Sequence, residues 1–299
     1  MMAEPKRVVI TGASSGIGAA LTRSLAAEGH QIYACARRAD QLRRVTKQET
    51  LALSYACDVS DEDQVAAFAK WVSARTAHVD AVVHCAGAFG AIGPMQTTDS
   101  QEWLRTIHTN VFGTYLIIKH MIPLLAQASS PRLVTFSGGG AFGPFANYSA
   151  YAVSKAAVVR LTETLAVELA SRRIVVHAVA PGFVATEIHE ATIRSGPELA
   201  GREFFEQTQR LLHEGRVPIE VPVACVKFLL SDAAAGLTGK TISASFDPWG
   251  TPAFVALIPK LNASEAYTLR RINLAEIADT ELRQALEHAH HEKTPLHAA

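Results

Sequence analysis

Tyr151 and Lys155 stand four residues apart in a segment of helical character, so their side chains share one face of a helix. A phenol is a weak acid with an ordinary pKa of about 10. A neighbouring ammonium stabilises the phenolate and lowers that pKa toward neutrality. Such a pair can protonate the alkoxide that develops when a carbonyl is reduced by hydride transfer. The spacing is common, so it gains meaning only where other elements place a hydride donor beside it.

A glycine-rich segment near the start of the chain is suited to hold that donor. Gly12, Gly16 and Gly18 lie between an expected strand and an expected helix. Gly12 permits a tight turn, Gly16 lets the backbone approach phosphates closely, and Gly18 allows close helix–strand contact. The free N–H groups at a helix start attract a pyrophosphate. The sequence therefore predicts a dinucleotide site after the first strand.

The elements that must position these residues alternate between short apolar runs and helical segments. The expected strands are Arg7–Thr11, Gln31–Ala36, Leu51–Asp58, Asp80–Cys85, Arg132–Ser137, Ile174–Ala180 and Thr241–Phe246. The expected helices are Ile17–Glu28, one capped by the Ser60 to Asp63 signature, Gln101–Leu125, Ser149–Ser171 and Pro222–Leu230. Runs without polar alternation are typical of parallel strands buried on both faces. This order predicts a Rossmann-like, doubly wound α/β sheet with its ligand crevice at the strand carboxyl ends.

Together these segments resemble the short-chain dehydrogenase/reductase family over roughly residues 6 to 247. The matching motifs are T-G-x-x-x-G-x-G at Thr11–Gly18, Asp58-Val59, Ala86-Gly87, Asn110, Tyr151 with Lys155, and Pro181-Gly182 with Thr186. The resemblance implies that Tyr151 is the acid/base, that Lys155 also holds the nicotinamide ribose, and that Asn110 opens its helix locally to bind a water in the proton relay. It implies cofactor contacts from Gly12, Ser14, Ser15, Gly16, Ile17, Gly18, Asp58, Val59, Ala86, Gly87, Lys155, Pro181, Gly182 and Thr186. It also implies a homodimer or homotetramer formed through the long helix that begins at Ser149.

The end of the second strand favours NADP(H) over NAD(H). An acid there would bind the adenosine ribose hydroxyls and repel a 2′-phosphate, but the chain has Ala36 followed by Arg37 and Arg38. A guanidinium pairs well with a phosphate, and Arg37 is the preferred candidate. The alternative is that one or both arginines are solvated, Arg38 in particular. Asp58 has a competing role as a turn former.

One departure from the resembled family concerns the catalytic serine, which normally stands thirteen positions before the tyrosine. An ungapped count places Gly138 there, with Ser137 beside it. Three explanations stay open: Ser137 reaches the substrate oxygen, backbone N–H groups of Gly138–Gly140 replace the hydroxyl, or the protein binds NADP without this chemistry. The sequence thus predicts an NADP(H)-dependent oxidoreductase that interconverts a carbonyl and a secondary alcohol. The alternative is a non-enzymatic NADP-binding regulatory or scaffold protein.

The substrate region is expected over about residues 187–217, as a lid with a helical stretch near Glu203–Leu212. Phe89, Phe142 and Phe145 are expected around the crevice and favour an apolar or ring-shaped substrate. The nucleotide-binding domain is expected to span residues 1–250. Residues 251–299 are an extension that carries an apolar stripe of Leu274, Ile277, Ala278, Leu282, Ala285 and Leu286, expected to pack on the domain or on a partner subunit. We expect no metal site, because His288, His290, His291 and His297 lack accompanying ligands.

Composition excludes several other classes of protein. The 299 residues carry 28 basic and 28 acidic side chains, which argues against a nucleic-acid or membrane-surface partner because both require excess positive charge. The four cysteines form no C-x-x-C pair, as is typical of a reducing compartment. No apolar stretch is long enough to span a bilayer. The sequence therefore predicts a cytoplasmic protein with a small-molecule substrate.

Overall fold

Seven parallel strands form one sheet in the computed structural model, which describes residues 4–214, 217–271, 276 and 279–284. The strands are β1 (Arg7–Thr11), β2 (Gln31–Ala36), β3 (Ala52–Ala56), β4 (Ala81–His84), β5 (Arg132–Phe136), β6 (Val175–Ala180) and β7 (Lys240–Ser243). They lie in the order β3-β2-β1-β4-β5-β6-β7, and each neighbouring pair is parallel. Every residue of β4 and β5 is buried, as expected of central strands covered on both faces. The predicted doubly wound α/β fold is confirmed.

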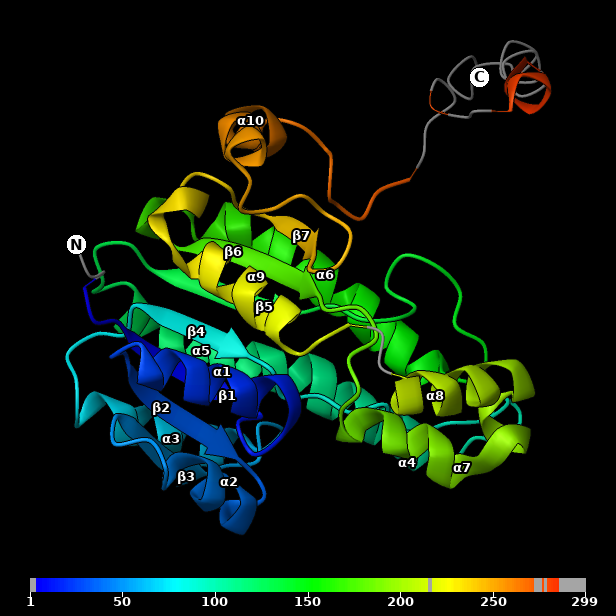
Figure 1. The fold of residues 1–299 in the computed structure, drawn as a ribbon, viewed down its shortest axis with the longest axis horizontal. Helices are drawn as coiled ribbons and strands as arrows, with labels where there is room; N and C mark the ends of the chain where they lie inside the picture. Colours follow the sequence, from blue (N-terminus) through cyan, green and yellow to red (C-terminus); the bar gives the residue numbers. More distant parts are fainter. Residues whose placement is uncertain (1–3, 215–216, 272–275, 277–278, 285–299) are drawn as a thin grey trace, which may run out of the picture. The chain divides into compact units, whose positions relative to one another are not determined.

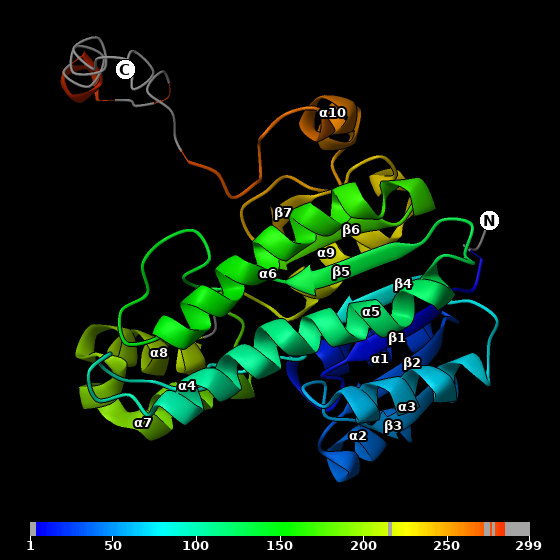
Figure 2. The ribbon, with the colours of Figure 1, turned by 180° about the vertical axis from the view of Figure 1, so that it is seen from behind.

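Helices cover both faces of the sheet (Figures 1 and 2). Helices α1 (Gly16–Ala27), α2 (Ala39–Thr46), α9 (Glu220–Leu230) and α10 (Pro252–Asn262) contribute to one apolar core, and α3 (Glu62–Ser73), α5 (Gly113–Leu125) and α6 (Ser149–Glu168) contribute to the other. The strand order reverses between β1 and β4, because β2 and β3 extend to one side and β5 to β7 to the other. In such sheets the ligand crevice lies at the carboxyl ends on either side of this switch point.

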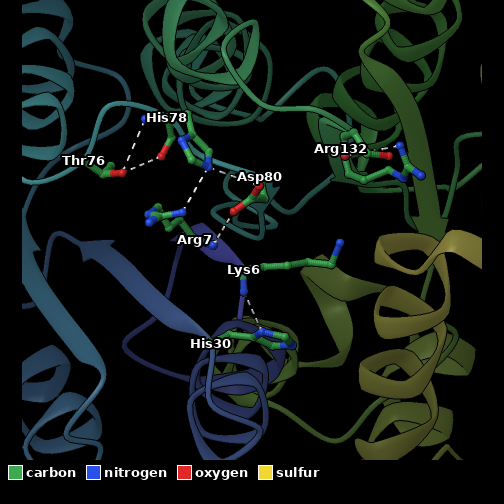
Figure 3. A network of polar contacts seen from close by, with 8 residues as sticks. Lys6, Arg7, His30, Thr76, His78, Asp80 and Arg132 are labelled. Atoms are coloured by element: carbon green, nitrogen blue, oxygen red, sulfur yellow. Dashed lines mark hydrogen bonds and ion pairs between the residues drawn. The ribbon is translucent and has the colours of Figure 1, made fainter. Parts of the chain in front are cut away.

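Polar contacts connect the chain at the amino-terminal ends of β1 and β4, on the side of the sheet away from the ligand crevice (Figure 3). The backbone N–H of Arg7 donates to Oδ2 of Asp80 at 2.7 Å, and the Arg7 guanidinium lies 3.0 Å from Nε2 of His78. The backbone N–H of Lys6 donates to Nδ1 of His30 at 3.0 Å. These contacts hold the strands together at their amino-terminal ends. None of them involves the carboxyl ends, where the ligand crevice is expected.

The helix expected over Gln101–Leu125 is interrupted. It consists of α4 (Ser100–Ile107), a π-helical turn η1 (His108–Phe112) and α5.

Several element limits also differ from the prediction. Helix α2 was not predicted, β3 is shorter than Leu51–Asp58, and β7 ends at Ser243 rather than Phe246. The prediction that Ser60 caps α3 is wrong, because Asp61 is the N-cap and its Oδ1 accepts a hydrogen bond from the Gln64 N–H at 3.1 Å.

The chain divides into two compact units: the first contains the sheet and reaches Thr268, and the second begins at Leu269. In the first unit, α10 buries Phe254 and Ile258 in the core, so compact packing continues beyond residue 250. Only Leu282 of the predicted apolar stripe falls within the described residues, and its side chain is exposed. The rest of that stripe and the four C-terminal histidines lie outside the described residues. The expected boundary near 250 and the role of the extension stay predictions.

Candidate active site

A cavity of about 890 Å³ opens at the carboxyl ends of the strands. The Gly12–Gly18 loop, Arg37 and Arg38 line one end of it, Tyr151 and Gly138 line the other, and the segment after β6 reaches both ends. The lining also contains Val59, Ala86, Gly87, Pro181, Gly182 and Thr186. The structure thus brings together most of the residues that the sequence assigned to a cofactor.

The glycine loop is shaped by contacts that leave no room for side chains. Gly12 has φ of +63°, and a Cβ there would lie 2.7 Å from the backbone nitrogen of Ala86. A Cβ on Gly18 would lie 2.5 Å from the Gly12 carbonyl oxygen. Gly16, with φ of +52°, faces the Thr186 side chain. Helix α1 begins at Gly16, so its free N–H groups lie beside the cavity. This cradle fits a dinucleotide pyrophosphate.

Arg38 dominates the adenosine end of the cavity. Its guanidinium donates to the Ser15 hydroxyl at 2.6 Å and the Ser14 hydroxyl at 3.3 Å, and it pairs with Glu187 at 2.6 Å. Arg37 makes only a looser ion pair, with Asp58 at 3.6 Å. Arg38 therefore contacts the phosphate-binding turn rather than being free in solvent. Asp58 accepts hydrogen bonds from the N–H and hydroxyl of Ser60, which is the turn-forming role weighed from the sequence.

Asn110 lies in the π-helical turn and is 1% exposed. Its Oδ1 accepts the Ala88 N–H at 2.9 Å, while its Nδ2 donates to the Ala88 carbonyl at 2.8 Å and to Oγ of Ser154 at 2.9 Å. It therefore connects the loop after β4 to α6, the helix that carries Tyr151 and Lys155. Cys85, before this loop, is largely buried, and burial raises the pKa of its thiol.

Lys155 is buried beneath Tyr151. Its Nζ donates to the Phe136 carbonyl at 3.0 Å and lies 5.5 Å from the centroid of the Tyr151 ring. Burial lowers the pKa of Lys155 to about 8 and raises that of Tyr151, so the lowering of the Tyr151 pKa expected from the sequence is not seen in this structure. The Tyr151 ring packs edge-on against Phe89, with centroids 4.6 Å apart. The acid and the cation thus share one buried environment at the catalytic end of the cavity.

Gly138 leaves a space that the Tyr151 hydroxyl fills. A Cβ built on Gly138 would lie only 2.3 Å from that hydroxyl. Ser137 points elsewhere: it is 2% exposed, its hydroxyl has no partner among the described residues, and it is not part of the cavity lining. In this structure, the serine considered as a substrate-oxygen donor does not reach the cavity. Two backbone hydrogen bonds lie nearby: the Ser137 N–H donates to the Val179 carbonyl, and the Ala141 N–H donates to the Gly138 carbonyl. Neither of these two bonds uses an N–H group of Gly138, Gly139 or Gly140.

The lid region forms helices α7 (Glu190–Ala200) and α8 (Arg202–Glu214) after a short 3-10 turn η3 (Glu187–His189). Gly196, with φ of 74° and ψ of 169°, kinks α7, and α7 was not predicted. Tyr148 and Thr192 are fully buried and share a hydrogen bond at 2.8 Å, which connects α7 to the start of α6. Phe89, Phe145 and Phe204 line the cavity, whereas Phe142 is exposed and outside the lining, so its predicted place is wrong.

Two residues of the lid side were not identified from the sequence. Glu187 pairs with Arg38, and His189 lines the cavity beside Phe183 and Ile188. No short-range spacing connects either residue to its partners, so no sequence signal was available for them. The described residues hold no cluster of three or more His, Cys, Asp or Glu suited to a metal ion. Within the same residues, no helix has the length and apolar character needed to cross a membrane.

The fold and cavity define a dinucleotide-binding oxidoreductase, and comparison with known proteins specifies its family. A family model described as short chain dehydrogenase matches residues 6–195. The chain belongs to the short-chain dehydrogenase/reductase family. It is accordingly an NAD(P)-dependent dehydrogenase that acts on CH–OH groups.

Among curated relatives, the cis-4-hydroxycyclohexanecarboxylate dehydrogenase of Sinomonas cyclohexanicum is 35% identical over 242 residues, 79% of this chain and 93% of that protein. The 3beta-hydroxysteroid dehydrogenase 1 of Eggerthella lenta is 32% identical over 245 residues, covering 79% and 91%. A putative short chain dehydrogenase from Escherichia coli CFT073, solved in complex with NADPH, has a TM-score of 0.71 at 23% identity, covering 82% and 98%. This last likeness concerns the fold.

Proposed function

We propose that this enzyme uses NADP(H) to interconvert a ring-shaped, largely apolar ketone and its secondary alcohol. The observation that carries the proposal is a cavity lined at one end by Tyr151 and at the other by the Gly12–Gly18 cradle, with Lys155 buried behind the Tyr151 ring. Two relatives are named for cyclic substrates, and aromatic rings line the catalytic end here. Their apolar faces suit a ring skeleton better than a polar open chain.

The preference for NADP(H) is supported by Arg38 and Arg37 at the adenosine end. Arg38 already donates to Ser14 and Ser15 on the phosphate-binding turn, so a 2′-phosphate there would meet two hydroxyls and a guanidinium. Arg37 is the second cation of this end. We therefore assign the main phosphate contact to Arg38 and a supporting one to Arg37. The contacts of Asp58, Val59, Ala86, Gly87, Pro181, Gly182 and Thr186 with the cofactor remain part of the proposal.

When bound in the Gly12–Gly18 cradle, NADP(H) would supply the hydride that reduces the carbonyl carbon. Tyr151 gives its phenolic proton to the carbonyl oxygen as negative charge develops there. Lys155 favours the resulting phenolate, because its ammonium lies under the phenol ring. Asn110 holds the loop at Ala88 against α6 and supports the relay that returns a proton to Tyr151.

Gly138, by this proposal, stands where family members carry a catalytic serine. Ser137 does not take over the role of that serine, because its hydroxyl is buried away from the cavity.

We further propose that the enzyme is a homodimer or homotetramer. Exposed apolar side chains on α4, η1, α5 and α6 support a subunit contact there: Leu104, Phe112, Tyr115 and Val153. The four cysteines, all unpaired, fit a cytoplasmic location.

Tyr151→Phe tests the catalytic assignment. A panel of cyclic ketones is followed by NADPH absorbance, and NADPH binding is measured in parallel by fluorescence. We expect turnover to fall at least about 1,000-fold with the cofactor Kd unchanged, because the phenyl ring keeps the packing and lacks only the proton. Retained turnover refutes the assignment. Tight NADPH binding by the wild type with no turnover of any carbonyl favours the non-enzymatic alternative.

A further inference from the structure

His189 lies at the catalytic end of the cavity without a role in the mechanism described so far. It is the last residue of η3, and its backbone N–H donates to the Thr186 carbonyl at 3.0 Å. Its side chain is 9% exposed, and it lines the same cavity as Tyr151 and Gly138. It therefore belongs to the wall of the cavity on the lid side.

Aromatic contacts hold the His189 ring in place. The ring stacks on Phe183 with centroids 3.9 Å apart and an interplanar angle of 23°. Its edge contact with Phe89 has centroids 5.4 Å apart. The same Phe89 packs against Tyr151, so His189 and Tyr151 flank one common ring. The imidazole is thus held in a defined orientation, with Phe89 as a neighbour that it shares with the proposed acid.

The imidazole has hydrogen-bonding capacity that the protein does not use. Nδ1 of His189 is buried and has no hydrogen-bond partner among the described residues. Burial also lowers the pKa of this side chain to about 4, so the ring is neutral at neutral pH, with one N–H donor and one acceptor nitrogen. A buried polar atom without a partner is unfavourable, and in a native protein it calls for an explanation such as a catalytic role or a bound water or ion.

The substrate oxygen needs a second donor that the usual position does not provide. Gly138 carries no hydroxyl, and Ser137 is outside the cavity lining. We propose that His189 donates a hydrogen bond from its ring N–H to the substrate oxygen, as the second donor beside Tyr151. This inference rests on the proposed function. The carbon accepts the hydride and the oxygen accepts the Tyr151 proton, while His189 keeps its own proton and leaves the cycle unchanged.

The test compares two substitutions at His189 with a control at His213, an exposed residue of α8 outside the cavity lining. His189→Phe keeps a ring for the contacts with Phe183 and Phe89 but removes both nitrogens. His189→Asn places an amide nitrogen close to the position of Nδ1. The control is His213→Phe. Each protein is assayed for kcat and KM with a cyclic ketone, for NADPH binding and for thermal unfolding.

We expect His189→Phe to lower kcat/KM about 100-fold, the usual effect of losing one such donor. The NADPH Kd should stay unchanged and Tm should not fall, because the substitution also removes a buried nitrogen without a partner. His189→Asn should recover at least about tenfold of the loss, and His213→Phe should match the wild type. Unchanged turnover in His189→Phe overturns the proposal. A loss accompanied by lower Tm and weaker NADPH binding, and not relieved by Asn, shows a packing role and also overturns it.

Failure of the proposed function is recognised separately. If the wild type turns over no carbonyl, His189 is tested by binding alone, in the Tyr151→Phe protein saturated with NADPH. Cyclohexanone is titrated into this protein with and without His189→Phe. A Kd about tenfold weaker in the double variant supports the hydrogen bond. An equal Kd, or no binding in either protein, overturns it.

Discussion

Gly138→Ala should slow the enzyme by displacing the Tyr151 hydroxyl. The new Cβ would lie 2.3 Å from that hydroxyl and 3.0 Å from the adjoining ring carbon, whereas ordinary contact begins at 3.4 Å. The phenol oxygen must therefore move by about 1 Å, and a misplacement of that size can cost about 100-fold in rate, or about 2.7 kcal/mol. The ring cannot move without disturbing Phe89, its edge-on neighbour.

Gly139→Ala is the matched control. Its Cβ would meet only the edge of the Phe145 ring, at 3.3 Å, so a small shift of one side chain relieves the contact. We expect kcat/KM within about threefold of wild type. Neither glycine has a positive φ, so an alanine introduces no backbone strain at either position. The two variants therefore differ mainly in what the added methyl group touches.

The assay measures initial rates of NADPH oxidation with a cyclic ketone, together with the NADPH Kd and Tm of each variant. Gly138→Ser introduces the same Cβ, so it should also be slower than wild type despite its added hydroxyl. Wild-type kcat/KM in Gly138→Ala refutes the reasoning, because Tyr151 would then act from a displaced position. Equal losses in the two alanine variants refute it too, since the effect would belong to the loop and not to Tyr151.

Four further substitutions test the remaining assignments. Arg38→Ala should weaken NADPH binding about tenfold or more and leave NADH binding nearly unchanged, because a charge-assisted phosphate contact is lost. Glu187→Gln should tighten NADPH binding, since Arg38 then lacks its competing carboxylate; equilibrium titration checks both. Lys155→Met should abolish turnover and raise the unfolding free energy of the cofactor-free protein by up to about 3 kcal/mol at pH 7. The folded pKa of Lys155 is about 8 against an ordinary 10.5, so the wild type regains this stability as the pH rises between these values, and the gain in the variant disappears above them. Val153→Glu on the exposed face of α6 should dissociate the proposed homodimer or homotetramer, as measured by light scattering.

The strands could be predicted because buried parallel strands have a clear signature. The run RVVIT gives β1 with its limits as expected, since covering helices require apolar residues on both strand faces. Strand ends were less certain, because they depend on partners distant in sequence. β7 ends at Ser243, whose N–H donates to Oδ2 of Asp247 at 2.6 Å, and this turn prevents the extension to Phe246. Likewise, β3 pairs with β2 only over Ala52–Ala56.

The proximity of Tyr151 and Lys155 could be predicted for a different reason. Tyr151 and Lys155 need only a helix to meet, and helical spacing is visible in the sequence. Ser137 shows the limit of such reasoning, because it stands beside the expected position but its hydroxyl is buried away from the cavity. Successive side chains near the end of a strand point to opposite faces of the sheet. A side chain one position away from the expected one therefore points into the core instead of into the cavity.

His189 and Arg38 could not be assigned from spacing because each depends on long-range packing. Arg38 contacts Glu187, which is distant in sequence, and the lid must fold back over the sheet for the two to meet. His189 comes beside Phe89 in the same way. The two ends of the cavity therefore share one requirement: the short segment from Glu187 to His189 must be in place. Because Tyr148 and Thr192 fix the following helix by a buried hydrogen bond, we expect lid position to connect the proposed cofactor contact at Arg38 with the proposed substrate contact at His189. By the proposal for His189, the lid supplies the second donor to the substrate oxygen.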